Sequence, residues 1–263
     1  MDAELINEVA LTRLCDSLGL QCDYRHQTRS TSADALLYYQ THQQPVVAVS
    51  ESQSAGRGRR GREWLSPFAQ NIYCSIGLEK SISANDQGLL SIVTGIALCR
   101  QLRKLIDIQV SLKWPNDLLF EGDKLGGILV ESRPLESDRF FFVVGFGLNV
   151  HMSAEALASI PQAATSLQTL SEAPVDRNEV LLACIESVVT DIRAFDCSAK
   201  PALISEFRQF DACINQPVVV ITAQDRIEGI CLGISDRGLL LLQTETGFEE
   251  FSSAEVSLRK VAP

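Results

Sequence analysis

Histidine is scarce in this sequence, and the usual spacings of metal ligands are missing from it. The chain has 263 residues with only 3 histidines, which lie far apart, and none of its 8 cysteines belongs to a C-x-x-C pair. Zinc sites are commonly built from such pairs together with histidine, so we expect no protein-bound metal. Without a secretory signal, the cysteines are expected to be reduced and mostly buried thiols.

Long apolar runs are missing as well. No stretch of 18 or more apolar residues occurs, and the most apolar segment, residues 140–150, has the length of a strand and contains two glycines. The first ten residues are acidic and lack the basic and apolar regions of a secretory signal. These features predict a cytoplasmic protein with no membrane contact.

Positive charge is in deficit. Lys and Arg total 23 against 33 for Asp and Glu, which gives a net charge of -10. Such a charge repels a phosphate backbone, so we expect no DNA partner. Hydrophobic residues at 46% and charged residues at 21% are near the globular average. The length predicts one large domain with a small companion.

The hydrophobic pattern divides the chain into two parts. Helical spacing of apolar residues predicts helices over residues 3–18, 88–105, 178–195 and 201–210, with a further helix opening at residues 30–34. Apolar runs predict strands over residues 46–49, 71–78, 110–114, 125–131 and 140–150, the last three as antiparallel neighbours. From residue 216 onward, five short strands predict a small barrel. We therefore expect domains of residues 1–212 and 213–263.

A segment rich in glycine and arginine follows the strand at residues 46–49. It reads QSAGRGRRGREW over residues 53–64 and contains three glycines and four arginines. Glycine allows close approach to the backbone, and guanidinium groups bind anions. The pattern favours a phosphate-bearing ligand, with a nucleic-acid contact or a plain surface loop as alternatives. The spacing of a P-loop is absent.

Two further segments place polar residues at the ends of predicted strands. KWPND (residues 113–117) and KLGGILVE (residues 124–131) form a predicted hairpin, in which Lys124 lies close to Asn116 and Asp117. A lysine–aspartate pair of no functional importance is the alternative. In GFGLNV (residues 145–150), Asn149 stands in an apolar run, where its amide needs either a ligand or a structural partner.

Together and in this order, GRGRRG followed by Trp64, KWPND, KLGGILVE and GFGLN closely resemble the catalytic core of biotin–protein ligases of the bacterial biotin–[acetyl-CoA-carboxylase] ligase type. The resemblance covers about residues 28–259. It implies an α+β fold: a central mixed β-sheet with helices on one side, which is a class II synthetase-like catalytic core, and a small C-terminal SH3-like β-barrel.

The resemblance also implies a reaction. Such ligases join biotin to ATP, which gives biotinyl-5′-AMP and releases pyrophosphate. They then transfer biotin to one lysine of the biotin carboxyl carrier domain of acetyl-CoA carboxylase or a related carboxylase. Mg²⁺ is expected with ATP, bound mainly by the phosphates and water.

Matching positions receive roles from the resemblance. Biotin contacts are implied for Ser30, Thr31, Ser32, Gln53, Gly56, Arg57, Gly58, Arg59, Lys124 and Gly127. Contacts to ATP or the adenylate are implied for Arg57, Arg60, Trp64, Asn116, Lys124, Asn149 and Arg259. The implied catalytic residues are Lys124, Arg59 and Asp117. The two cations offset the charges of the carboxylate and α-phosphate as these meet, and Asp117 accepts a proton from the carrier lysine.

Two features depart from the family pattern. Ser32 stands where many bacterial relatives have the longer Asn. Residues 1–27 are too few for the DNA-binding domain of the regulatory members, so we expect no repressor activity. Relatives occur as monomers and dimers, which leaves a homodimer open. The alternatives are a lipoate–protein ligase or octanoyl transferase, a nucleic-acid-binding protein, and an inactive relative.

Overall fold

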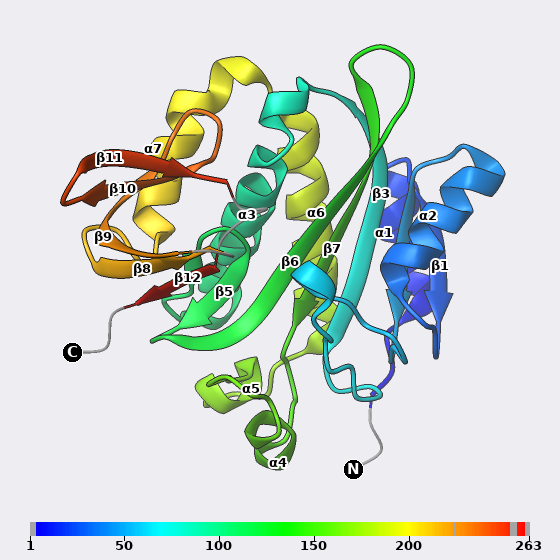
Figure 1. Cartoon of the computed structure of the whole chain (residues 1–263). Helices are drawn as coiled ribbons and strands as arrows, with labels where there is room; N and C mark the ends of the chain where they lie inside the picture. The colour runs from blue at the N-terminus through cyan, green and yellow to red at the C-terminus, as the bar shows by residue number, and fades with distance from the viewer. Residues whose placement is uncertain (1–3, 223–224, 253–256, 261–263) are drawn as a thin grey trace.

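The chain forms two β-sheets, and helices pack against the larger one (Figure 1). The computed structural model describes residues 4–222, 225–252 and 257–260, the last of these as backbone only. The α-helices within these ranges are α1 (Glu8–Ser17), α2 (Thr31–His42), α3 (Leu89–Ile106), α4 (Ala154–Ala158), α5 (Leu167–Leu170), α6 (Arg177–Ala194) and α7 (Lys200–Phe210).

The larger sheet has the strand order β1-β2-β3-β7-β6-β5-β4. Its strands are β1 (Gln21–Arg25), β2 (Val46–Ser50), β3 (Ile72–Ser81), β4 (Ser111–Lys113), β5 (Asp117–Phe120), β6 (Asp123–Pro134) and β7 (Arg139–Leu148). β1 and β2 run parallel, and every other neighbouring pair is antiparallel. The sheet is therefore mixed, as the resemblance implied.

Helices cover both faces of this sheet. In β2, Val47 and Val49 belong to the core that includes α1, α3 and α6. The alternate residues Val46 and Ala48 pack with Tyr39 of α2 in a second core on the opposite face. The expectation of helices on one side only is thus wrong for α2. The reason is that β2 carries apolar side chains on both of its faces, so helices must pack against each face to exclude water.

Two strands of the larger sheet were not predicted. β1 is five residues long and exposed at both ends, and β5 is four residues long. β5 lies between β4 and β6, so the segments at residues 110–114 and 125–131 are not direct neighbours. The turn of the hairpin is at Glu121 and Gly122, which both have positive φ. The short helices α4 and α5 were also missed.

One predicted helix begins later than its apolar pattern indicated. α1 begins at Glu8 because the side chain of Asn7 caps it by accepting a hydrogen bond from the backbone N–H of Ala10. Residues 4–7 are not helical, and residue 3 lies outside the described residues.

The smaller sheet has the order β11-β10-β9-β8-β12 and is antiparallel throughout. Its strands are β8 (Pro217–Ile221), β9 (Arg226–Ile234), β10 (Leu240–Thr244), β11 (Gly247–Phe251) and β12 (Ser257–Lys260). All five were predicted, so the α+β fold with a small C-terminal β unit is confirmed. A hydrogen bond of 3.0 Å from Trp114 Nε1 to the carbonyl oxygen of Gly238 joins this sheet to the KWPND segment.

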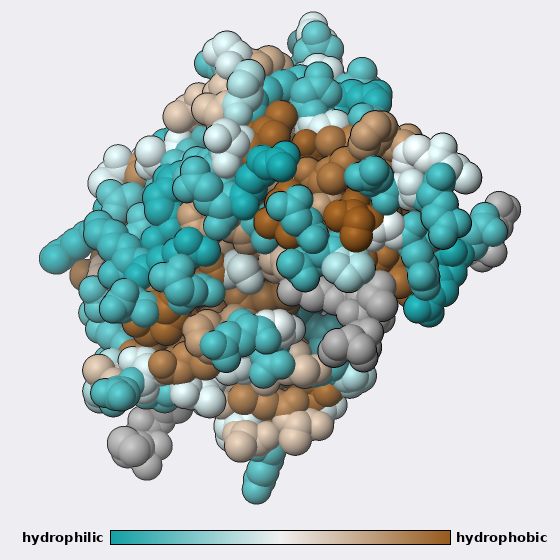
Figure 2. Space-filling model, turned by 90° about the vertical axis from the view of Figure 1, so that its left-hand side faces the viewer, coloured by the Kyte–Doolittle hydropathy of each residue, from teal (hydrophilic) through white to brown (hydrophobic). Residues whose placement is uncertain are grey.

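The surface on the side of the smaller sheet is mostly hydrophilic, with apolar residues in patches between the polar ones (Figure 2). Phe248 of β11 is the most exposed of the large apolar side chains in the described part of the chain, at 78%. No helix in that part is long and apolar enough to span a bilayer.

Candidate active site

A cavity of about 810 Å³ lies against strands β3, β6 and β7 of the larger sheet. The segment between β2 and β3, residues 51–71, forms one wall and is called the arginine loop below. The first turn of α2, the turn between β4 and β5 and residues 159–164 form the others. The cavity therefore collects segments that are far apart in the sequence.

Most of the residues named from the sequence line this one cavity. They are Ser30, Thr31, Ser32, Gln53, Arg57, Gly58, Arg59, Arg60, Trp64, Asn116, Asp117, Lys124, Gly127 and Asn149. Gly56 does not line it. A Cβ on Gly56 would lie 2.6 Å from the carbonyl oxygen of Trp64, so this glycine lets two parts of the loop approach each other. Arg259 lies on β12, and its side chain is outside the described residues.

One end of the cavity is lined by hydroxyl and amide groups. The Oε1 atom of Gln53 accepts hydrogen bonds from the backbone N–H of Thr31 at 2.9 Å and from its hydroxyl at 3.2 Å. The hydroxyl of Ser75 lies 2.8 Å from that of Thr31 and 3.1 Å from that of Ser32. The three hydroxyl groups are buried and Gln53 is partly buried; together they donate and accept hydrogen bonds, which suits an uncharged polar ligand group. We call them the hydroxyl end.

Ser75 was not named from the sequence. It stands in the middle of β3, is completely buried, and faces the cavity. A lone serine within the apolar run of residues 72–78 is the signal that would have indicated it, because a buried hydroxyl requires a partner.

Lys124 and Asp117 form an ion pair in this cavity, with 2.7 Å between Nζ and Oδ1. Their side chains are only 18% and 24% exposed, so water weakens the attraction less than at an open surface. A register shift between β5 and β6 leaves Leu125 as an extra residue in β6. Such a bulge reverses the alternation of faces, and Lys124 therefore points to the same side as Gly127 and Asp117. The predicted proximity of Lys124 and Asp117 is confirmed.

The indole ring of Trp64 packs directly on the backbone of β6 and β7, at two glycines that have no side chain to separate them from it. Gly127 and Gly147 are paired across these strands. A Cβ on Gly147 would lie 2.6 Å from the indole, and one on Gly127 would lie 3.2 Å from it. The Nζ atom of Lys124 is 5.4 Å from the ring centroid. The indole N–H is buried and has no partner among the described residues, so it is available to an acceptor on a ligand.

The arginines of the loop surround the cavity mouth. Arg57 donates to Glu131 at 3.1 Å, and Arg59 donates to the side-chain oxygen of Asn116 at 3.4 Å. Burial, followed by the charge of Arg60, lowers the pKa of Arg59. An anion bound beside Arg59 would offset both effects.

The charge of the cavity is opposite to that of the whole chain. Among its lining residues, the acidic ones are Glu63 and Asp117, and the basic ones are Arg57, Arg59, Arg60, Arg62, Lys113 and Lys124. In a chain with a net charge of -10, this local excess of cations indicates an anionic ligand.

Metal-ligating side chains are not gathered at any point of the described chain: no group of three or more His, Cys, Asp or Glu residues is placed to hold an ion. The cysteines are free thiols, and most of them are buried. What the lining of the cavity offers to a ligand is cationic side chains, hydroxyl groups and an aromatic ring.

Comparison with known sequences gives two family matches. Residues 24–149 match the Biotin/lipoate A/B protein ligase family, and residues 213–259 match the Biotin protein ligase C terminal domain. The biotin–[acetyl-CoA-carboxylase] ligase of Mycobacterium tuberculosis is 35% identical over 233 residues, which cover 84% of this chain and 83% of that protein.

The bifunctional ligase/repressor BirA of Escherichia coli is 36% identical over 215 residues. The match covers 81% of this chain and 66% of that relative, so the chain spans just under two thirds of its length. Among solved structures, the biotin protein ligase from Aquifex aeolicus in complex with biotin and ATP superposes with a TM-score of 0.74. It is 29% identical, and the match covers 91% of this chain and 99% of that one.

Proposed function

This chain belongs to the biotin protein ligase family, and from this premise we propose that it is a biotin–[acetyl-CoA-carboxylase] ligase. It joins biotin to ATP, releases pyrophosphate, and transfers biotin from biotinyl-5′-AMP to a lysine of a biotin carboxyl carrier domain of acetyl-CoA carboxylase or a related carboxylase. The observation that carries the proposal is a single cavity with an uncharged hydroxyl end and a strongly basic mouth.

The hydroxyl end suits the ureido ring of biotin. A urea offers one carbonyl acceptor and two N–H donors, and the side chains of Ser30, Thr31, Ser32, Gln53 and Ser75 provide matching partners. Gly127 leaves room for the biotin chain along β6. Biotin bound in this direction extends its carboxylate toward Lys124.

The first step needs cations between two anions. A carboxylate oxygen of biotin attacks the α-phosphorus of ATP, and the bond to the pyrophosphate oxygen breaks. Lys124 and Arg59 offset the charges of both reactants, which repel each other as they approach. Arg57, Arg60 and Gly58 of the loop, together with Arg259, complete the phosphate contacts. Mg²⁺ accompanies ATP and shields the phosphates, bound by them and by water.

The adenylate is held beneath the arginine loop. Trp64, Asn116 and Asn149 contact it, with the indole N–H of Trp64 free to donate to the ligand. Closure of the loop keeps water from the mixed anhydride. Gly56 permits this closure because it has no side chain to separate the two halves of the loop.

The second step needs a base for the carrier lysine. Its amine attacks the acyl carbon, AMP leaves, and Asp117 accepts the proton. Asp117 is one of two acidic residues among those that line the cavity, and it is the one next to Lys124. We expect Asp117→Asn to slow transfer from preformed biotinyl-5′-AMP more than it slows pyrophosphate release.

The domain arrangement follows from the same proposal. Residues 1–212 form the biotin- and ATP-binding domain, and residues 213–263 form the C-terminal domain. The free thiols suit a reducing compartment, and we propose the cytoplasm.

The deciding experiment supplies ATP, Mg²⁺ and either biotin or lipoate, and it measures pyrophosphate release and then transfer to an apo carrier domain. We expect release and transfer with biotin and neither with lipoate. Lipoate-dependent release would assign the chain to the lipoate branch of the wider family. No release with either acid would reject the ligase activity.

A further inference from the structure

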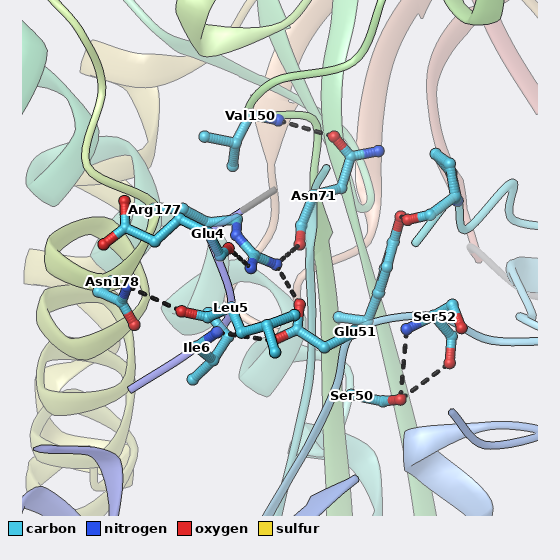
Figure 3. Close-up of polar contacts among 12 residues, drawn as sticks. Glu4, Leu5, Ile6, Ser50, Glu51, Ser52, Asn71, Val150, Arg177 and Asn178 are labelled. Atoms are coloured by element: carbon cyan, nitrogen blue, oxygen red, sulfur yellow. Dashed lines mark hydrogen bonds and ion pairs between the residues drawn. The ribbon is translucent and has the colours of Figure 1, made fainter. Parts of the chain in front are cut away.

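The arginine loop begins and ends at residues that contact one buried side chain, that of Arg177 (Figure 3). Arg177 is the first residue of α6, and Glu51 and Asn71 are the first and last residues of the loop. The Nη1 atom of Arg177 donates to Oε2 of Glu51 at 2.7 Å and to the carbonyl oxygen of Asn71 at 3.1 Å. The side chains of Arg177 and Glu51 are 3% and 0% exposed. One guanidinium group thus joins both ends of the loop.

Other groups complete the contacts of this pair. Oε1 of Glu51 accepts hydrogen bonds from the backbone N–H of Ile6 and from the hydroxyl of Tyr24, both at 2.6 Å. The Nη2 atom of Arg177 donates to the carbonyl oxygen of Glu4, as Figure 3 shows. The N-terminal segment and β1 therefore close the cluster from outside, and the loop lies on its other side.

Both ends of the loop lead directly into the cavity. Gln53, two residues after Glu51, belongs to the hydroxyl end, where it accepts hydrogen bonds from Thr31. At the other end, Oδ1 of Asn71 accepts a hydrogen bond of 2.9 Å from the backbone N–H of Val150. The residue before it, Asn149, lines the cavity. The ion pair itself does not line the cavity, so it acts on a ligand only through these neighbours.

Stability alone does not account for the cluster. Removing two charges from water offsets most of the attraction between them, so a buried ion pair contributes little net stability. The Nε atom of Arg177 is also buried without a partner among the described residues, which adds a cost. An apolar pair would fill the same space without these costs. It would not, however, fix the directions of two chain segments, because hydrophobic contact has no preferred direction.

We propose that Arg177 is a positioning residue of the ligase. Its guanidinium holds the two ends of the arginine loop at the spacing at which Gln53 and Asn149 both face the ligand. The loop can then open and close while its ends stay in place. This inference deepens the proposed function and rests on it.

The test compares Arg177→Lys with Arg100→Lys. Lysine keeps the charge of Arg177, but a single ammonium group replaces the planar fork that reaches several acceptors. Arg100 of α3 is the control because it also joins two separate segments of the chain, through Asp191 of α6 and Glu206 of α7, and it does not line the cavity. Three quantities are measured for each protein: the thermal unfolding temperature, the Kd for biotin alone, and the ratio of biotinyl-5′-AMP hydrolysed to biotin transferred.

We expect Arg177→Lys to raise the Kd for biotin about tenfold or more, and to raise the hydrolysis ratio, in protein that is folded at the assay temperature. Arg100→Lys should leave both quantities within about twofold of the unmodified chain. A purely structural role of Arg177 would lower the unfolding temperature without changing the affinity or the ratio of the folded molecules.

The proposal would be overturned if the Kd for biotin and the hydrolysis ratio of Arg177→Lys both stayed within about twofold of those of the unmodified chain. If that variant does not fold, the double variant Glu51→Leu/Arg177→Met leaves no unpaired buried charge and undergoes the same measurements. Failure of both variants to fold would also overturn it, because the pair would then be a requirement of the whole fold. An unmodified chain that binds no biotin would instead reject the proposed function.

Discussion

Lys124 and Asp117 face each other across the β5–β6 hairpin because β6 contains one extra residue. Without Leu125 as a bulge, the three-residue separation of Lys124 and Gly127 would place them on opposite faces of β6. With it, the Nζ atom of Lys124 lies 2.7 Å from Oδ1 of Asp117 inside the cavity. The bulge thus places the one lysine of KLGG inside the cavity, where the proposed reaction develops negative charge.

Removal of the Lys124 side chain tests this arrangement. We expect Lys124→Ala to lower the rate of biotin-dependent pyrophosphate release by about 100-fold or more, since a cation aimed at the reacting phosphate is lost. Lys104→Ala, at an exposed position of α3, is the control and should keep full activity. Pyrophosphate release with less than about a threefold change in Lys124→Ala would reject the role of Lys124.

A methyl group on Gly147 should displace Trp64. Its Cβ would lie 2.6 Å from the indole, so either the ring or the strand has to move, and such overpacking costs about 1–3 kcal/mol. We expect Gly147→Ala to speed the dissociation of biotinyl-5′-AMP about tenfold or more, as measured by release of labelled adenylate. Gly88→Ala is the matched control, because nothing lies within 4 Å of that position. Equal dissociation rates of biotinyl-5′-AMP from the two variants would contradict a role for the close packing of Trp64 on Gly147.

The two tryptophans should differ in their effect on stability. Trp114→Phe removes the hydrogen bond to Gly238 and should lower the free energy of unfolding by about 1 kcal/mol. Trp64→Phe removes an N–H that has no partner in the described part of the chain. The free energy of unfolding without ligand should therefore lose no hydrogen-bond contribution. Urea unfolding of both variants makes the comparison, and similar losses would show that the link between the two sheets contributes no stability.

Stability should depend on pH through Tyr39 and Glu79, which join α2 to the sheet. The hydrogen bond from Tyr39, then that from Arg139, lowers the pKa of Glu79 below its usual 4.5. Burial, then the contact with Glu79, raises the pKa of Tyr39 to about 12. A lowered carboxyl pKa contributes stability that is present above pH 4.5 and is lost as the pH falls through the folded-state value.

Tyr39→Phe should therefore be less stable than the unmodified chain at neutral pH, and the difference should shrink as the solution is acidified below about pH 4.5. On the alkaline side, the contribution of Tyr39 is present below pH 10 and is lost as the pH rises through about 12. Thermal unfolding temperatures across the acidic range provide the measurement. Phenylalanine keeps the stacking on Phe141, so the variant isolates the hydroxyl. A stability difference that stays constant across the acidic range would contradict the link to the ionisation of Glu79.

The long elements of the fold could be predicted because their apolar residues repeat over many positions. α3 and α6 each extend over 18 residues, and β7 is apolar along most of its length. β1 and β5 were missed because four or five residues of mixed polarity carry no clear period. Their positions depend on neighbouring strands that are distant in the sequence.

The cavity residues on recognisable motifs could be named in advance, whereas their supports could not. Ser75 matters because Thr31 and Ser32 come within hydrogen-bonding distance of it, more than 40 residues away in the chain. Glu51 and Arg177 are separated by 126 residues, and neither stands in a distinctive motif. The extra residue in β6 is visible only once the strands are paired.

The paired glycines beneath Trp64 make three distant positions of the chain interdependent over evolution. A lineage that gained a side chain at Gly127 or Gly147 would lose the space that the indole occupies, and a smaller residue in place of Trp64 would restore it. These three positions should therefore change together among descendants of a common ancestor, and a genetic screen that starts from a weakened Gly147→Ala strain should recover revertants altered at codon 64.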